Sequence, residues 1–281
     1  MTEWHMIIDP VLCENCNNCV LAVKDEYVGN DFPGYTAPHP DQGQGVIRIG
    51  RVVRGSGSQI DTAYLPQLCN HCADAPCQRY APDVVRRRED GIVIIDPERA
   101  RGRRDLVDSC PYGAIVWNEA EQLPQQWIFD AHLLDQGWKE PRIQTVCPTE
   151  AITCVRTTPA AMAARVQAEG LEVLKPELQT KPRVYYRNLY RVRDCFVAGS
   201  VAVVIGTGTE CCAGATVTLE GGATVQSVTT DHFGDFKFDG LPTGSGPYRL
   251  TVIHPDFGTV ESDVGRLESS LSLGEILLQN T

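Results

Sequence analysis

Two short cysteine runs and two later Cys-Pro pairs carry the chemistry of this chain. The runs are Cys13-Glu-Asn-Cys16-Asn-Asn-Cys19 and Cys69-Asn-His-Cys72-Ala-Asp-Ala-Pro-Cys77. Three thiolates on one tight loop, with a distant fourth beside a proline, is how a chain surrounds a cubane iron–sulfur cluster. The fourth thiolates available are Cys110 and Cys147, each followed by proline. Together these eight cysteines are enough for two [4Fe–4S] clusters.

Zinc and disulfide bonds are the competing interpretations of a cysteine-rich chain. A Cys-x-x-Cys pair is also half of a tetrahedral zinc site, but zinc sites usually combine two such pairs. Here both runs are triplets and both remaining partners are single cysteines. Disulfide frameworks belong to small secreted domains, whereas 281 residues can bury an ordinary core. The spacing therefore favours iron–sulfur clusters.

Composition limits the classes of partner. The net charge of −11 argues against a general binder of nucleic acid or of anionic membranes, because phosphate contacts need a basic face. The segment from Met1 to Asp9 has neither a basic start nor an apolar stretch typical of an export signal, and no apolar run has the length of a membrane span. Free thiolates fit a reducing compartment, so we expect a cytoplasmic protein. An exported partner could still carry a signal for both proteins.

The elements predicted around the cysteines repeat loosely. A strand at Trp4 to Asp9 leads into the first cysteine run, and a loop-rich stretch with one strand at Val46 to Val53 precedes the second. Strand, helix, Cys-Pro and strand is the repeating unit of ferredoxin-type folds. The first predicted copy has a strand at Gly91 to Asp96, a helix opened by Pro97, the pair Cys110-Pro111 and a strand at Ala114 to Trp117. The second copy is looser: a helix over Gln125 to Asp135, the pair Cys147-Pro148 and a strand at Ala151 to Val155.

The remainder of the chain changes in character. Thr158 and Pro159 predict the start of a helix that ends at Gly170, followed by a proline-punctuated extended strap up to residue 188. From about Val197, short strands between Gly- and Thr-rich turns indicate a small antiparallel β-sandwich. We therefore predict an α+β protein with two domains: residues 1–196, a ferredoxin-like iron–sulfur domain of two pseudo-repeated halves, and residues 197–281, an immunoglobulin-like β-sandwich.

Two arginine-rich runs stand out in this acidic chain, residues 86–88 and residues 99–104. Most charge runs are solvated faces, and that alternative remains open. The other interpretation is a docking surface for an acidic partner, or positive charge that stabilises a reduced cluster.

The other candidate ligands are weaker. His71 lies between two cysteines of the second run, and we expect it to pack beside the site without binding metal. Cys154 is expected to be a small buried apolar residue. Cys195 has no predicted role, and the neighbouring Cys211 and Cys212 could hold a soft metal, although a structural role is the simpler interpretation.

These motifs resemble a known family. The two triplets, the Cys-Pro pairs and the phrases Cys110-Pro-Tyr-Gly113 and Pro182-Arg-Val-Tyr-Tyr186 are similar to those of the iron–sulfur subunits of the dimethyl sulfoxide reductase family of molybdenum enzymes. The C-terminal segment resembles immunoglobulin-like modules of the Cna-B and carboxypeptidase-regulatory type. With that segment added, the resemblance narrows to the small subunits of pyrogallol–phloroglucinol transhydroxylase and related anaerobic phenol hydroxylases, such as resorcinol hydroxylase.

The resemblance implies how the ligands are shared. In the family the last cysteine completes the first triplet and the middle one completes the second. The implied sets are therefore Cys13, Cys16, Cys19 and Cys147 for one [4Fe–4S] cluster, and Cys69, Cys72, Cys77 and Cys110 for the other. Relatives with more clusters bind a further cluster through four cysteines, and the resemblance places other residues at those positions here: Val23, Trp127, Asp130 and Ile143. This further cluster is therefore expected to be absent, and Trp127 is expected to fill its volume.

The resemblance also implies a partner and a function. A large catalytic subunit would carry molybdenum and a bis-molybdopterin guanine dinucleotide and act on a polyphenol, and this chain would be its non-catalytic electron-transfer subunit in a heterodimer. A soluble electron acceptor is a further expected partner. Two alternatives stay open: an electron-transfer subunit of another molybdenum oxidoreductase, acting on formate or an oxyanion, and a scaffold whose clusters only hold the fold.

Overall fold

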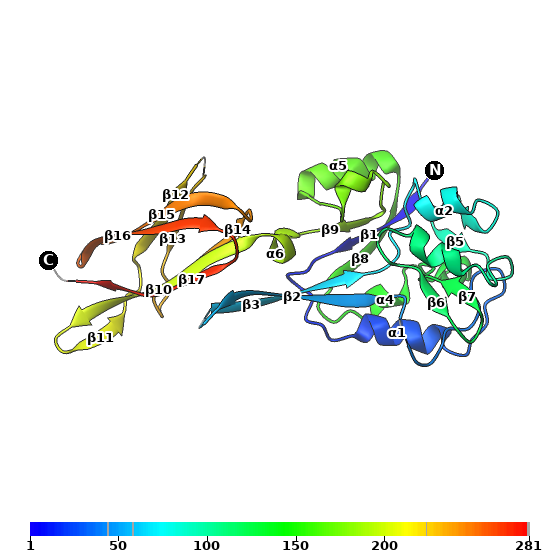
Figure 1. Ribbon diagram of the computed structural model, residues 1–281, viewed down its shortest axis with the longest axis horizontal. Helices are drawn as coiled ribbons and strands as arrows, with labels where there is room; N and C mark the ends of the chain where they lie inside the picture. Colours follow the sequence, from blue (N-terminus) through cyan, green and yellow to red (C-terminus); the bar gives the residue numbers. More distant parts are fainter. Residues whose placement is uncertain (44, 58, 223, 280–281) are drawn as a thin grey trace. The chain divides into compact units, whose positions relative to one another are not determined.

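The computed structural model describes residues 1–43, 45–57, 59–222 and 224–279 (Figure 1). The chain divides into two compact units. Unit 1 consists of Met1–Gly50 and Tyr64–Leu189, and unit 2 of Arg51–Ala63 and Tyr190–Thr281. None of the helices in these described ranges is long and apolar enough to cross a membrane.

Unit 1 is built on a three-stranded sheet whose central strand is the first of the chain. β1 (Glu3–Ile8) pairs antiparallel with β8 (Ile152–Thr157) and parallel with β9 (Val184–Tyr186). Five of the six β1 residues are buried, because the strand is covered on both faces. The segment predicted as an extended strap therefore differs from expectation in one respect: its last part, Val184–Tyr186, is a strand of this sheet.

Short helices and two-stranded ribbons surround the sheet. The elements are α1 (Asn18–Tyr27), α2 (Pro76–Tyr80), the ribbons β4 (Val85–Arg87) with β5 (Val93–Ile95) and β6 (Val116–Asn118) with β7 (Leu123–Gln125), α3 (Ala131–Asp135), α4 (Arg142–Thr145) and α5 (Pro159–Glu169). Thr158 caps α5 by accepting a hydrogen bond from the Ala161 N–H at 3.2 Å, and Gly170 ends the helix in the left-handed conformation, which confirms the predicted boundaries.

Two predicted helices of unit 1 were wrong in extent. The helix expected over Gln125 to Asp135 is only the single turn α3, because Phe129 and Asp130 have left-handed backbone angles that break it. The helix expected from Pro97 is a turn followed by a 3₁₀ helix, η1 (Arg104–Ser109). A second 3₁₀ turn, η2 (Pro176–Leu178), follows α5.

A long hairpin, β2 (Arg48–Ser56) and β3 (Gln59–Gln67), replaces the single strand predicted at Val46 to Val53. By its contacts, the part of the hairpin from Arg51 to Ala63 belongs to unit 2. The predicted β-sandwich therefore has a contribution from a segment far upstream in the sequence.

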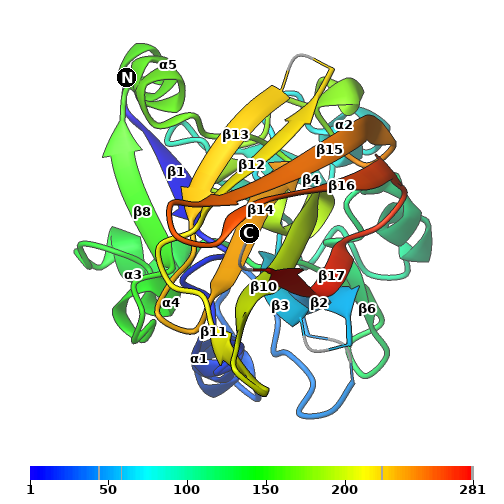
Figure 2. The ribbon, with the colours of Figure 1, turned by 90° about the vertical axis from the view of Figure 1, so that its left-hand side faces the viewer.

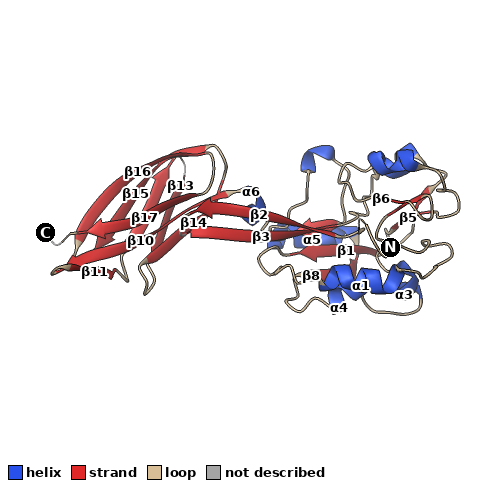
Figure 3. Ribbon diagram, turned by 60° about the horizontal axis from the view of Figure 1, so that its bottom comes forward, coloured by secondary structure: helices blue, strands red, loops and turns tan. Residues whose placement is uncertain are grey.

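Unit 2 consists almost entirely of strands (Figure 3). They are β10 (Cys195–Ile205), β11 (Gly208–Cys211), β12 (Thr216–Gly221), β13 (Thr224–Thr229), β14 (Asp235–Leu241), β15 (Ser245–His254), β16 (Gly258–Leu267) and β17 (Leu271–Leu278), preceded by α6 (Tyr190–Arg193). One sheet holds β11, β10 and β14 in that order, with β17 also paired to β10, and the other runs β13-β12-β15-β16 (Figure 2). These pairings are antiparallel except for the parallel pair β10–β17. The apolar residues of both sheets share one buried cluster.

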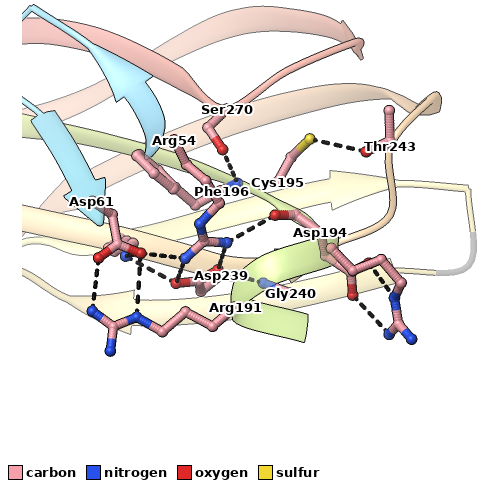
Figure 4. Close-up of polar contacts among 12 residues, drawn as sticks. Arg54, Asp61, Arg191, Asp194, Cys195, Phe196, Asp239, Gly240, Thr243 and Ser270 are labelled. Atoms are coloured by element: carbon pink, nitrogen blue, oxygen red, sulfur yellow. Dashed lines mark hydrogen bonds and ion pairs between the residues drawn. The ribbon is translucent and has the colours of Figure 1, made fainter. Parts of the chain in front are cut away.

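A buried arginine joins the hairpin to the strands of unit 2 (Figure 4). Arg54 is 7% exposed, and its guanidinium donates to both carboxylate oxygens of Asp239, at 2.8 and 3.1 Å, and to the Asp194 carbonyl at 2.8 Å. It also pairs with Asp61 and lies over the Phe196 ring, 5.3 Å from the centroid. These contacts make this part of the hairpin an integral part of unit 2.

Candidate metal centres

The second cysteine run and Cys110 surround one small cavity in unit 1. Its walls are formed by side chains from the run, from β5 and from the segment after β7; they include Cys69, Cys72, Cys77, Cys110, Val93 and Gln126. Pro76 begins α2 and turns Cys77 inward, while Cys110 follows η1. The structure thus brings together the four thiols that the resemblance assigned to one set.

Three of these thiols, those of the second cysteine run, are strongly desolvated. Burial raises the pKa of Cys72 to about 11 and of Cys77 to about 12, and holds the pKa of Cys69 well above its usual range. Neighbouring thiols of the set act in the same direction. Because a ligating sulfur must be a thiolate, loading iron into this cavity has to release protons. Such a pocket favours neutral thiols or metal-bound thiolates over free thiolate anions.

Arg183 is a residue of this site that sequence reasoning did not single out. It is 3% exposed, pairs with Glu3 at 2.9 Å and donates to the His71 carbonyl at 2.8 Å. Burial raises the pKa of the Cys72 thiol, and the positive charge of Arg183 lowers it. The only sequence signal was its place in the family phrase beginning at Pro182.

His71 packs beside the cavity, as predicted. Its Nδ1 accepts the Val93 N–H at 3.1 Å, and its ring makes edge contacts with Trp127 and Phe129. Burial lowers the His71 pKa to about 3, so the imidazole is neutral. The His71 backbone N–H points towards the sulfur of Cys69 at 3.5 Å.

The first cysteine run lies beside Cys147. Asn15 and Asn17 have left-handed backbone angles that curl the loop, and α1 begins at Asn18. The Asn18 side chain donates to the Val146 carbonyl at 3.4 Å, next to Cys147. Burial raises the pKa of Cys19 to about 11, with smaller contributions from the other three thiols of this set, Cys13, Cys147 and Cys16.

The two sets differ in exposure. Cys16 is exposed and Cys13 and Cys147 are half-buried, whereas Cys69, Cys72 and Cys77 are all buried. Within the described part of the chain, no three His, Cys, Asp or Glu side chains converge in the manner of ligands to one metal ion. A cubane holds its four ligand sulfurs further apart than a single zinc ion does, so thiols arranged around a cavity fit a cluster better than zinc.

A hydrogen-bonded network is centred on Asp130, one of the four non-cysteine positions singled out by the family resemblance. Asp130 is 1% exposed and accepts hydrogen bonds from Tyr27 Oη at 2.5 Å, Trp127 Nε1 at 3.1 Å and the Arg142 N–H at 2.8 Å. Burial raises the Asp130 pKa in spite of these three donors. Val23, Trp127 and Ile143 are buried as well. All four positions are therefore buried, and the Asp130 carboxylate accepts hydrogen bonds from three donors.

The remaining cysteines join neither set. Cys154 is buried in β8, as predicted, and burial keeps its pKa far above the usual value. Cys195 is buried in β10, with its sulfur 3.4 Å from the Thr243 hydroxyl. Cys211 is exposed and Cys212 is buried in unit 2.

Comparison with known proteins agrees with this geometry. The 4Fe-4S dicluster domain family matches residues 60–157, and the carboxypeptidase regulatory-like domain family matches residues 200–270. The pyrogallol hydroxytransferase small subunit of Pelobacter acidigallici is 45% identical over 248 residues, which cover 87% of this chain and 89% of that protein.

More distant relatives are of the same type. One subunit of the tetrathionate reductase of Salmonella typhimurium is 30% identical over 69% of this chain and 75% of its own length. One polypeptide of the anaerobic dimethyl sulfoxide reductase of Escherichia coli is 26% identical over 66% of this chain and 92% of its own length. The chain therefore belongs to the family of iron–sulfur subunits of dimethyl sulfoxide reductase-type molybdenum enzymes, in which the hydroxytransferase small subunit is also a member.

Proposed function

We propose that this chain is the electron-transfer subunit of a molybdenum hydroxylase or transhydroxylase that acts on polyphenols. A large partner subunit would carry the molybdenum and its bis-molybdopterin guanine dinucleotide. The observation that carries the proposal is the cavity lined by Cys69, Cys72, Cys77 and Cys110, in a chain 45% identical to the small subunit of a pyrogallol hydroxytransferase.

The ligand sets follow from the same reasoning. Cys13, Cys16, Cys19 and Cys147 would hold one [4Fe–4S] cluster, here named cluster 1, and Cys69, Cys72, Cys77 and Cys110 the other, cluster 2. When bound, each cluster takes up and gives back one electron. Each would belong to one of two pseudo-repeated halves of unit 1, with unit 2 as the β-sandwich.

Metal analysis tests the assignment. The purified complex should contain about eight iron and about eight sulfide per copy of this chain, since two complete four-thiolate sets are available. Cys110→Ser should remove the paramagnetic resonance signal of cluster 2 alone, and Cys147→Ser that of cluster 1 alone. Values near twelve iron, stoichiometric zinc, or loss of the other signal would contradict the assignment.

The Asp130 network bears on how electrons move. The resemblance implies that Val23, Trp127, Asp130 and Ile143 stand where relatives with more clusters bind a further electron carrier, so exchange between the two clusters should be slow. Cluster 1, by resemblance the nearer to the molybdenum subunit, would exchange electrons with that subunit, and cluster 2 would serve a docked acceptor. Freeze-quench paramagnetic resonance after adding substrate tests this order. Reduction of both clusters within one turnover would favour an ordinary electron-exporting hydroxylase.

A second candidate comes from the wider family. The 30% identity to a tetrathionate reductase subunit supports an electron-transfer role with a different molybdenum subunit, one that acts on an oxyanion. Identification of the co-purifying large subunit and of its substrate separates the two. Clusters that never change oxidation state during turnover would instead indicate a scaffold.

A further inference from the structure

The two arginine-rich runs differ in how their charges are balanced. In the run at residues 99–104, every arginine is paired with a carboxylate. The pairs are Arg99–Asp96 at 3.8 Å, Arg101–Glu121 at 3.2 Å, Arg103–Asp105 at 2.9 Å and Arg104–Glu119 at 3.4 Å. This run is therefore a balanced, solvated surface that offers little net attraction to an acidic partner.

The other run lacks this balance. Arg86 donates to the Gly34 carbonyl at 2.8 Å, and Arg87 donates to the Ala73 carbonyl at 3.3 Å. Carbonyl groups orient the two guanidinium groups but leave their charge in place. Among the described residues no carboxylate lies within 4.0 Å of Arg86, Arg87 or the exposed Arg156 of β8.

These three arginines line one open, polar groove of unit 1. Arg88 also lines it, but its charge is balanced by Asp90 at 3.0 Å and Asp135 at 2.7 Å. The other residues that line the groove are Met1, Thr2, Glu89 and Asp90. Glu89, Asp90 and Asp135 oppose the four arginines, so the groove keeps a small excess of positive charge, carried by Arg86, Arg87 and Arg156, in a chain of net charge −11.

The groove lies next to the cavity that the second cysteine run and Cys110 line. In the β4–β5 ribbon, Arg87 is directly opposite Val93, and Val93 lines the cavity. The Ala73 carbonyl that binds Arg87 belongs to the loop between Cys72 and Cys77. The positive groove and the proposed site of cluster 2 thus share a strand pair and a loop.

We propose that the groove formed by Arg86, Arg87 and Arg156 is the docking site for an acidic, one-electron carrier protein that exchanges electrons with cluster 2. This inference rests on the proposed function of the cysteine sets. The carrier takes up one electron and the reduced cluster loses one, so no proton or bond change is required. Charge complementarity selects an acidic protein, because arginines with free guanidinium edges bind carboxylates in pairs.

The test compares two triple variants of the intact complex that remove the same charge. One is Arg86→Gln/Arg87→Gln/Arg156→Gln, and the other is Arg99→Gln/Arg101→Gln/Arg104→Gln. The probe is an acidic plant-type ferredoxin. Binding is measured by calorimetry at low and high salt, and its reduction by the dithionite-reduced complex by stopped flow. We expect the groove variant to lose at least about tenfold in rate and affinity at low salt and to lose most of its salt dependence.

The carboxylate-paired variant should stay within about twofold of wild type. Equal losses in both variants would show that only net charge matters, and unchanged binding in the groove variant would also overturn the proposal. Loss of the large subunit from the groove variant on gel filtration would assign the groove to subunit assembly instead. Reduction of methyl viologen, a small cation, tests the clusters themselves. A complex that cannot reduce methyl viologen would contradict the proposed function. A complex that reduces methyl viologen but does not bind or reduce the ferredoxin would contradict only the proposed docking site.

Discussion

Replacement of Arg54 by methionine should destabilise unit 2 substantially. The Arg54 side chain is 6% exposed and is shared by Asp61 and Asp239, whose side chains are 14% and 23% exposed. Removing one member of a buried ion pair costs about 3–5 kcal/mol, because the partner charge is left without compensation. Here Asp61 keeps Arg191 at 2.9 Å and Asp239 keeps Lys237 at 2.9 Å, so the lower limit, about 3 kcal/mol, applies.

This loss can be measured separately from effects on unit 1. Unit 2 has roughly one hundred residues, for which 1 kcal/mol corresponds to about 4 °C, so the melting midpoint should fall by about 12 °C. Calorimetry of the full chain detects both units, whereas tryptophan fluorescence detects unit 1 alone, since every tryptophan lies there. The tryptophans are Trp4, Trp117, Trp127 and Trp138.

Arg249→Met is the matched control in the same unit. Arg249 is 60% exposed and meets Glu261 and Asp263 at 3.6 and 3.5 Å, so its loss should cost less than about 1 kcal/mol, or about 4 °C. Similar shifts for the two variants, or a shift for Arg54→Met seen only by fluorescence, would refute the reasoning.

Contacts within each unit give three further expected outcomes. Arg183→Met should lower the reduction potential of cluster 2 in a redox titration monitored by paramagnetic resonance, because a buried positive charge stabilises the reduced state; an unchanged potential would assign Arg183 a structural role only. Burial lowers the pKa of His5 and of His39 from 6.5 to about 4, so both bind protons more readily when unfolded, and the tryptophan-detected stability of unit 1 should decline as pH falls from 6.5 towards 4. His5→Phe should weaken that decline, and an identical pH profile would contradict the assignment. Truncation after residue 196 should leave the visible absorption of the clusters intact, since the proposed ligands all precede it; loss of iron would implicate the cysteines of the removed segment.

The candidate ligands were readable from sequence because each triplet is a local feature. Cys69, Cys72 and Cys77 lie on one short loop, and their spacing alone indicates a shared site. Arg183 was not readable in this way. Its hydrogen-bond partners, Glu3 and the His71 carbonyl, are 180 and 112 residues away along the chain, so only the folded sheet brings them together.

The elements that were mispredicted are those that tertiary contacts control. The segment Gln125 to Asp135 has a helical pattern, but Asp130 takes a left-handed conformation while its carboxylate accepts hydrogen bonds from Tyr27, Trp127 and the Arg142 N–H. The hairpin was only half predicted because its second strand, Gln59–Gln67, contains a proline and shows no clean apolar alternation. Its buried residues are Ala63, Leu65 and Pro66. Capping at Thr158 and Gly170 was predicted correctly because it depends on neighbouring residues alone.

The order of strands in the unit 1 sheet has a consequence for synthesis of the protein. β1 is made first but lies between β8 and β9, so its second neighbour is synthesised completely only when residue 186 has been added. Until then the apolar residues Met6, Ile7 and Ile8, all buried in the finished sheet, belong to a strand with open edges. Exposed apolar surface of this kind makes a growing chain prone to aggregate until the sheet is complete. The first strand therefore sets the length of chain that the cell must protect before the fold can close.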